Sequence, residues 1–184
     1  MSSRALARVA GLFYALNFIL GIAALVWQRD ALTGWANQAL VAAAVDYAIV
    51  ILLFACLFEA AGRSLSWSVA AIGLVGCGLS LLGPLDLFPS PVNALAVFGL
   101  YCLGLGALIV RSDMMPRTIG LVLMAGGVSW LTFASPSLAA RLQPWNMAPG
   151  ALAELVFTLW LLVFGVRSVD EAAPNAEESS SLAA

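Results

Sequence analysis

The sequence contains no histidine and no lysine, so all eight of its cationic residues are arginines. Without histidine, no Ser–His or Cys–His pair can activate a nucleophile, and the usual histidine ligand sets for zinc, haem and di-iron are excluded. The arginines are scattered singly or in pairs, so no basic patch indicates nucleic-acid binding. We therefore expect a protein that is not an enzyme and that has no cofactor, no metal site and no nucleic-acid partner.

Charged residues of either sign are also scarce. They make up 10% of the 184 residues, whereas 62% are hydrophobic. A soluble domain usually carries about 25% charged residues. The chain has too few polar groups to cover a surface that faces water. We expect the lipid bilayer to be its solvent and its main partner.

Six apolar segments run along the chain. A helix needs about 20 residues to cross the roughly 30 Å hydrocarbon core of a bilayer. The segments predict an all-α fold, a polytopic transmembrane helix bundle with six spans in residues 1–168. Residues 169–184, rich in acidic residues, Ser and Ala, predict a disordered acidic cytoplasmic tail. The predicted spans are residues 9–27, 39–61, 65–83, 94–110, 118–134 and 150–166.

The arginines predict the orientation of the spans, because loops on the cytoplasmic side carry an excess of Arg. If the N-terminus is cytoplasmic, the external loops hold only Arg29 and Arg141. We therefore expect both termini in the cytoplasm (N-in, C-in). The segments that would be cytoplasmic hold the other six arginines, Arg4, Arg8, Arg63, Arg111, Arg117 and Arg167.

Two local patterns predict further structure. Ser135-Pro136 is typical of a helix N-cap followed by proline at the first helical position. It predicts a short interfacial helix on the outer surface, ending near Pro144. Glycines cluster in the third, fourth and fifth predicted spans, and they favour close packing between membrane helices over flexible hinges.

Residues 98–130 read FGLYCLGLGALIVRSDMMPRTIGLVLMAGGVSW. A Gly-rich helix is followed there by Arg111-Ser112, Pro116-Arg117 and Gly120-Leu121. This pattern resembles the central signature of the bacterial domain-of-unknown-function 4386 family. The opening ARVAGLFYALNFILGI and the closing ALAELVFTLWLLVFGV are similar to its first and last helices. The resemblance implies a multi-pass protein of the bacterial cytoplasmic (inner) membrane with about six helices, and it implies no activity.

Ionisable side chains inside membrane spans are costly, and each is therefore a candidate for function. Glu59 and Arg63 are four residues apart near the end of the second predicted span. This spacing places two side chains on one helix face. We expect them to form a structural ion pair.

Asp46 has no arginine within helical reach, and both Asp46 and Glu154 fall in the outer half of their predicted spans. With Asn17, Ser80 and Ser129 they predict a polar cavity in that half of the bundle. Apolar surroundings favour the protonated form of a carboxyl group, which suits proton exchange. Alternatively, Asp46 is hydrogen-bonded to Asn17 or Tyr47, and Glu154 reaches the headgroup region or Arg141.

Two functional hypotheses follow. The first is a small proton- or cation-coupled carrier that uses the polar cavity. The alternative is a non-catalytic membrane assembly or regulatory subunit, which forms a homo-oligomer or binds other membrane subunits. A carrier predicts an aqueous path to Asp46, whereas a packing subunit predicts that both acids are sealed and hydrogen-bonded.

Overall fold

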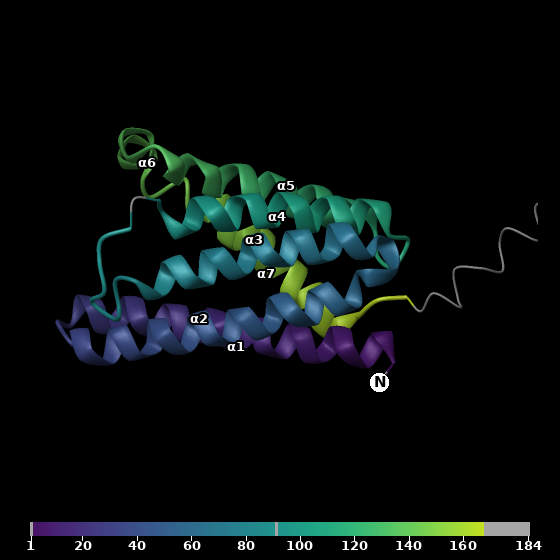
Figure 1. Ribbon diagram of the computed structural model, residues 1–184, viewed down its shortest axis with the longest axis horizontal. Coiled ribbons are helices and arrows are strands. Elements are labelled where there is room, and N and C mark those ends of the chain that lie inside the picture. Colours follow the sequence, from purple (N-terminus) through teal and green to yellow (C-terminus); the bar gives the residue numbers. More distant parts are fainter. Residues whose placement is uncertain (1, 91, 168–184) are drawn as a thin grey trace, which may run out of the picture.

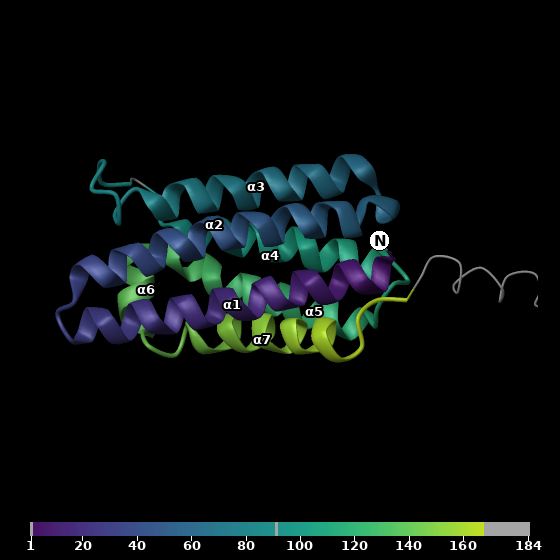
Figure 2. The same ribbon diagram turned by 90° about the horizontal axis from the view of Figure 1, so that it is seen from below.

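The computed structural model describes residues 2–90 and 92–167, and these residues form helices and connections without a strand. The long helices lie side by side along one axis (Figure 1), as the turned view also shows (Figure 2). The expected all-α fold is confirmed. The predicted tail, residues 169–184, lies outside the described residues. The helices are α1 (Ser3–Arg29), α2 (Thr33–Leu57), η1 (Glu59–Ala61), α3 (Arg63–Leu81), α4 (Ala94–Arg111), α5 (Arg117–Leu131), η2 (Thr132–Ala134), α6 (Pro136–Leu142) and α7 (Ala148–Val163).

Five helices in the described part of the chain are long and apolar enough to cross a membrane: α1, α2, α3, α4 and α5 with η2. The sixth predicted span corresponds to α7, which is apolar but has only 16 residues. The count of six spans therefore stays a prediction.

The ends of the second span differ from the expectation. Helix α2 starts at Thr33, before the apolar run, and includes the polar Asn37 and Gln38 in its early turns. It ends at Leu57, because the chain then forms the short η1 and turns at Gly62, whose φ is +146°. A φ of this size is readily adopted only by glycine. The midpoint of α2 therefore lies at residue 45, and Asp46 sits near the middle of the helix rather than in its outer half.

Both ends of the described chain lie at one end of the bundle, and α6 lies at the opposite end (Figure 1). Helix α7 runs back from the α6 end and stops before Gly165, whose φ of +69° favours glycine. Beyond it, the Arg167 backbone N–H donates to the carbonyl oxygen of Met114 at 2.8 Å. The C-terminal segment is thus attached to the α4–α5 connection.

Helices α4 and α5 pack closely through paired glycines. A Cβ atom on Gly106 would lie 2.6 Å from the carbonyl oxygen of Gly120, and one on Gly99 would lie 2.8 Å from that of Gly127. Contacts this short leave no room for a side chain. These glycines therefore serve close helix packing, as the sequence predicted.

Helix α6 begins at Pro136 with Ser135 as its N-cap residue, as predicted, but the Ser135 side chain makes no capping hydrogen bond. Its Oγ instead contacts Ser137 Oγ at 3.1 Å. The helix ends at Leu142, and Trp145 just beyond it is 79% exposed. An exposed tryptophan at the end of a bundle suits the interface between lipid and water.

Candidate functional site: the Glu154 cavity

Glu154 on α7 accepts hydrogen bonds from three other helices. The Tyr14 hydroxyl on α1 donates to Oε2 at 2.7 Å, and the Trp130 indole Nε1 on α5 donates to Oε1 at 2.7 Å. The Cys102 thiol on α4 approaches Oε1 at 3.7 Å. An ionised carboxylate only accepts hydrogen bonds and has about four acceptor positions. The three donors match that form and leave capacity for a further partner.

The approach of Trp130 to Glu154 depends on small residues in α5 and α7. A Cβ atom on Gly150, one turn before Glu154, would lie 2.6 Å from the indole Nε1 of Trp130. A Cβ atom on Gly126, one turn before Trp130, would lie 2.6 Å from the Cβ of Ala153. The two glycines allow the helix backbones to approach, and the indole ring lies across α7 in the space that results.

A second hydrogen bond extends this network toward α2. The hydroxyl oxygens of Tyr14 and Tyr47 are 3.2 Å apart. Because Tyr14 donates to Glu154, the Tyr47 hydroxyl is the donor of this second bond when the carboxyl group is ionised. The Tyr47 ring also packs edge-on against Phe98, with 5.1 Å between ring centroids. A chain of hydroxyl groups therefore connects Glu154 to Tyr47.

A cavity of about 250 Å³ lies beside this network, between the long helices. Its apolar wall includes Leu40, Ala43, Leu95 and Phe98. Leu95 follows the first residue of α4, so the cavity extends from the middle of the bundle toward the α6 end. Its polar wall is formed by Asn17, Tyr47, Ser80, Trp130 and Glu154.

Three of the five predicted cavity residues, Asn17, Ser80 and Glu154, thus line one cavity. Their polar groups differ in what they contact. The Asn17 amide donates to the carbonyl oxygen of Ala43 at 2.7 Å, and the Ser80 hydroxyl donates to that of Cys77 at 2.7 Å. The polar groups of Asn17 and Ser80 are therefore bonded to the backbone, whereas the carboxyl group of Glu154 is bonded to side chains of other helices.

Asp46 is not among the residues that line this cavity. It precedes Tyr47 on α2, and successive helical residues point about 100° apart. Tyr47 faces the cavity, while Asp46 is buried beside Asn17 of α1. Asn17 is its polar neighbour, yet neither Asp46 oxygen meets hydrogen-bond geometry with any described residue. The expected bond to Tyr47 is not formed, and Asn17 lies beside Asp46 as expected but outside hydrogen-bond geometry.

Ser129 is also absent from the cavity wall. Its hydroxyl donates to the backbone carbonyl oxygen of Asn146. The Asn146 amide in turn donates to Thr132 Oγ1 at 3.0 Å. Ser129 therefore attaches the end of α5 to the connection between α6 and α7, which positions α7 and its carboxyl group.

No cationic side chain in residues 2–90 and 92–167 forms an ion pair with Glu154. The arginine pairs found there are with Glu59 and Asp113, outside the cavity. The same residues contain no cluster of three or more His, Cys, Asp or Glu side chains that could hold a metal ion. The carboxyl group of Glu154 contacts neutral donors and borders the cavity.

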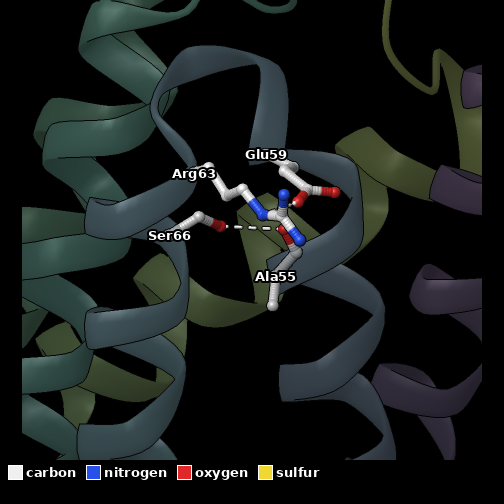
Figure 3. Close-up of polar contacts among 4 residues, drawn as sticks. All are labelled: Ala55, Glu59, Arg63 and Ser66. Carbon is white, nitrogen blue, oxygen red and sulfur yellow. Dashed lines mark hydrogen bonds and ion pairs between the residues drawn. The ribbon is translucent and has the colours of Figure 1, made fainter.

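Glu59 and Arg63 are in contact at the end of the bundle that carries the N-terminus. Arg63 Nε lies 2.8 Å from Glu59 Oε1. The Arg63 side chain is 82% exposed and the Glu59 side chain is 40% exposed. Figure 3 shows the pair at the α2–α3 turn, next to the hydrogen bond from Ser66 Oγ to the carbonyl oxygen of Ala55. The pair joins η1 to the first residue of α3, not two turns of one continuous helix as the spacing had suggested.

Sequence reasoning missed the partners of Glu154. The expected partners of its carboxyl group were the headgroup region or Arg141. The carboxyl group instead accepts hydrogen bonds from Tyr14, Trp130 and Cys102. A usable signal existed in the glycines one turn before Trp130 and one turn before Glu154, because facing small residues mark a close helix crossing.

One comparison with known proteins finds a family model that matches part of the chain. The model of the family described as Domain of unknown function (DUF4386) matches residues 92–165. The matched part contains the Gly-rich signature and α7, and so includes Cys102, Trp130 and Glu154. The resemblance seen in the sequence is therefore confirmed there. No curated protein and no solved structure matches the chain.

Proposed function

We propose that this chain, whose residues 92–165 match the DUF4386 family, is a small proton- or cation-coupled carrier of the bacterial cytoplasmic membrane. Its coupling residue in this proposal is Glu154 and not Asp46, because Asp46 does not line the cavity. The family supplies no activity, so the proposal rests on the geometry of the cavity. No covalent chemistry is part of it.

In this proposal α7 is the sixth span and both termini are cytoplasmic. A 16-residue helix is about 24 Å long, somewhat shorter than the roughly 30 Å hydrocarbon core. Local thinning of the bilayer accommodates such a mismatch at modest cost. The positions of the arginines support the orientation, because six of the eight belong to segments at the N-terminal end of the bundle.

Reporter fusions at residue 184 should behave as cytoplasmic and fusions near residue 143 as external; an external signal at residue 184 would rule out six spans.

One observation carries the functional proposal. Glu154 is an acidic side chain in the middle of an apolar bundle, it lines a cavity, and no described cation neutralises it. Burying a carboxylate in a membrane protein is expensive, so such residues usually mark a pathway for ions or protons. A ligand cation or a proton would supply the missing positive charge.

The surrounding hydroxyl groups suit this exchange. When Glu154 is protonated, the site is neutral; when the proton leaves, the carboxylate can hold a cation. The chain from Glu154 through Tyr14 to Tyr47 leads from the carboxyl group to a second point on the cavity wall. Rotation of these hydroxyl groups would let a proton pass between the two points.

Proton flux into liposomes tests the proposal. The purified full chain, reconstituted with a pH-sensitive dye inside, should move protons when a gradient of Na⁺, K⁺ or ammonium is imposed. Glu154→Gln should abolish this flux, and Glu59→Gln, which alters an exposed carboxyl group, should retain it. A wild-type signal no larger than that of protein-free liposomes, or equal flux in Glu154→Gln, would overturn the carrier function.

The same three hydrogen bonds support a second candidate, a non-catalytic membrane assembly or regulatory subunit. A carboxylate that accepts bonds from α1, α4 and α5 can serve as a structural link between helices. In that case no cation gradient moves protons, and Glu154→Gln lowers only stability. The mass of the purified complex in detergent would then show whether the chain forms a homo-oligomer or retains another membrane subunit.

A further inference from the structure

We infer that the ligand of the Glu154 cavity is a small monovalent organic cation, an alkylammonium ion whose charge pairs with Glu154 and whose apolar body lies against the aromatic wall. This inference deepens the proposed carrier function and rests on it for transport. Binding itself can be measured without any flux.

The charge of the cavity favours a cation. Glu154 is the acidic residue on its wall, and the wall carries no basic residue. A buried carboxylate is stable only when a partner compensates its charge. An anionic ligand would add a second negative charge and is disfavoured.

The rest of the wall favours an organic cation over a divalent metal ion. Calcium and magnesium require about six or more oxygen ligands, and the described residues hold no cluster of acidic, His or Cys side chains that could supply them. The rings of Tyr47, Phe98 and Trp130 instead form part of the wall. Aromatic rings attract ammonium groups through their negative faces and also pack against alkyl carbon.

The size of the cavity limits the ligand. Its volume is about 250 Å³, slightly below the roughly 300 Å³ at which pockets for drug-sized molecules start. A short alkylammonium ion suits a cavity of this size better than a drug-sized molecule does.

Protons should compete with the ligand, because protonation of Glu154 removes the charge that binds the ammonium group. The other titratable side chains near this carboxyl group are Tyr14 on α1, Tyr47 on α2, and Tyr101 and Cys102 on α4. All of them are neutral when protonated and negative when ionised, and none carries a positive charge in either form. None can replace the ammonium ion as a source of positive charge.

Calorimetric titration of the purified full chain in detergent tests the inference. The probes are n-butylammonium, tetramethylammonium and the neutral 1-butanol, at neutral and at mildly acidic pH. At least one ammonium ion should bind at neutral pH, binding should weaken on acidification, and 1-butanol should not bind. Glu154→Gln should weaken ammonium binding at least about tenfold, and Glu59→Gln should leave it unchanged.

A second pair of variants keeps the test valid if Glu154→Gln does not fold. Phe98→Leu retains an apolar side chain but removes a ring from the cavity wall. It should weaken ammonium binding about threefold to thirtyfold. Phe164→Leu is the control, because Phe164 is 61% exposed and lies beyond the end of α7; it should bind like the wild type.

The outcomes separate this inference from the carrier proposal. If ammonium ions bind in a way that depends on Glu154 and Phe98 but no flux is seen, the binding site is supported and the carrier function is overturned. If proton flux depends on Glu154 but the folded wild type binds neither ammonium ion, the carrier function is supported and the proposed ligand class is overturned. Equal binding of 1-butanol and n-butylammonium would also overturn the ligand class.

Discussion

The two carboxyl groups in the middle of the bundle have opposite surroundings. Glu154 on α7 has three hydrogen-bond donors from three helices and borders a cavity. Asp46 on α2 is 6% exposed, its oxygens have no hydrogen-bond partner among the described residues, and it does not line that cavity.

The difference teaches that an acidic residue inside a membrane bundle does not by itself define a site. Donors that converge on a carboxyl group from several helices stabilise it and fix its position, and an adjoining cavity gives a ligand access to it. Only Glu154 meets both conditions. The loss of Glu154 should therefore destabilise the bundle, whereas the loss of the Asp46 carboxyl group should not.

Glu154→Ala should have the largest effect on stability. It leaves the Tyr14 hydroxyl and the Trp130 indole without their acceptor, and an unsatisfied buried donor costs about 1–3 kcal/mol. We expect the free energy of unfolding to fall by about 3 kcal/mol, measured by reversible unfolding in mixed micelles with a denaturing detergent. A loss below about 1 kcal/mol would mean that the donors find other acceptors and that Glu154 is not a structural centre.

Gly150→Ala should have the next largest effect, without touching the carboxyl group itself. The new methyl group would displace the Trp130 indole from Glu154, and overpacking of this kind costs about 1–3 kcal/mol. We expect a loss of about 2 kcal/mol and a shifted indole N–H resonance for Trp130. Gly78→Ala is the matched control, because no atom lies within 4 Å of a Cβ placed there, and it should not reduce stability. Equal stability of the two variants would contradict the close α5–α7 packing.

Asp46→Leu should act in the opposite direction. Leucine has the same number of side-chain heavy atoms as aspartate and branches at the same carbon, and it removes a buried polar group that has no hydrogen-bond partner among the described residues. Replacing such a group by an apolar one of similar volume is often stabilising. We expect a gain of about 1 kcal/mol in the same unfolding assay and unchanged ammonium binding. A loss of stability would show that Asp46 has a partner that the described residues do not supply.

The sequence predicted the fold well because hydropathy acts locally. Six apolar segments appear as six helices, and the glycines of α4 and α5 pack as expected. The predicted ends of α2 were wrong, because the ends of a helix depend on backbone geometry as well as on hydropathy. The early turns include the polar Asn37 and Gln38, and the turn at Gly62 is preceded by η1.

The candidate site was predicted only in part. Counting residues from the helix centres brought Asn17, Ser80 and Glu154 together, because depth in a bundle follows the rise of 1.5 Å per residue. The same count could not tell which way each side chain points around its helix. The count therefore assigned Asp46 to the cavity, whereas the residue of α2 that faces the cavity there is the next one, Tyr47. The convergence of Tyr14, Trp130 and Cys102 on Glu154 depends on which helices are neighbours. The glycines before Trp130 and Glu154 indicate a close crossing of α5 and α7, but no comparable pattern places α1 and α4 beside them.

Glu59→Gln should have the smallest effect, and it completes the contrast between exposed and enclosed acids. Glu59 pairs with Arg63 at 2.8 Å, but both side chains are exposed (Figure 3). Exposed ion pairs contribute about 0–1 kcal/mol, because water screens the charges and two long side chains must be ordered. The α2–α3 turn also retains the buried hydrogen bond from Ser66 to Ala55. We therefore expect the free energy of unfolding to change by less than about 0.5 kcal/mol, and this change should disappear in high salt.

Ser66→Ala, which removes the buried bond instead, should cost about 1 kcal/mol and be insensitive to salt. If Glu59→Gln instead destabilised the protein more than Ser66→Ala, the ion pair would hold this turn, and the distinction between exposed and enclosed acids would fail.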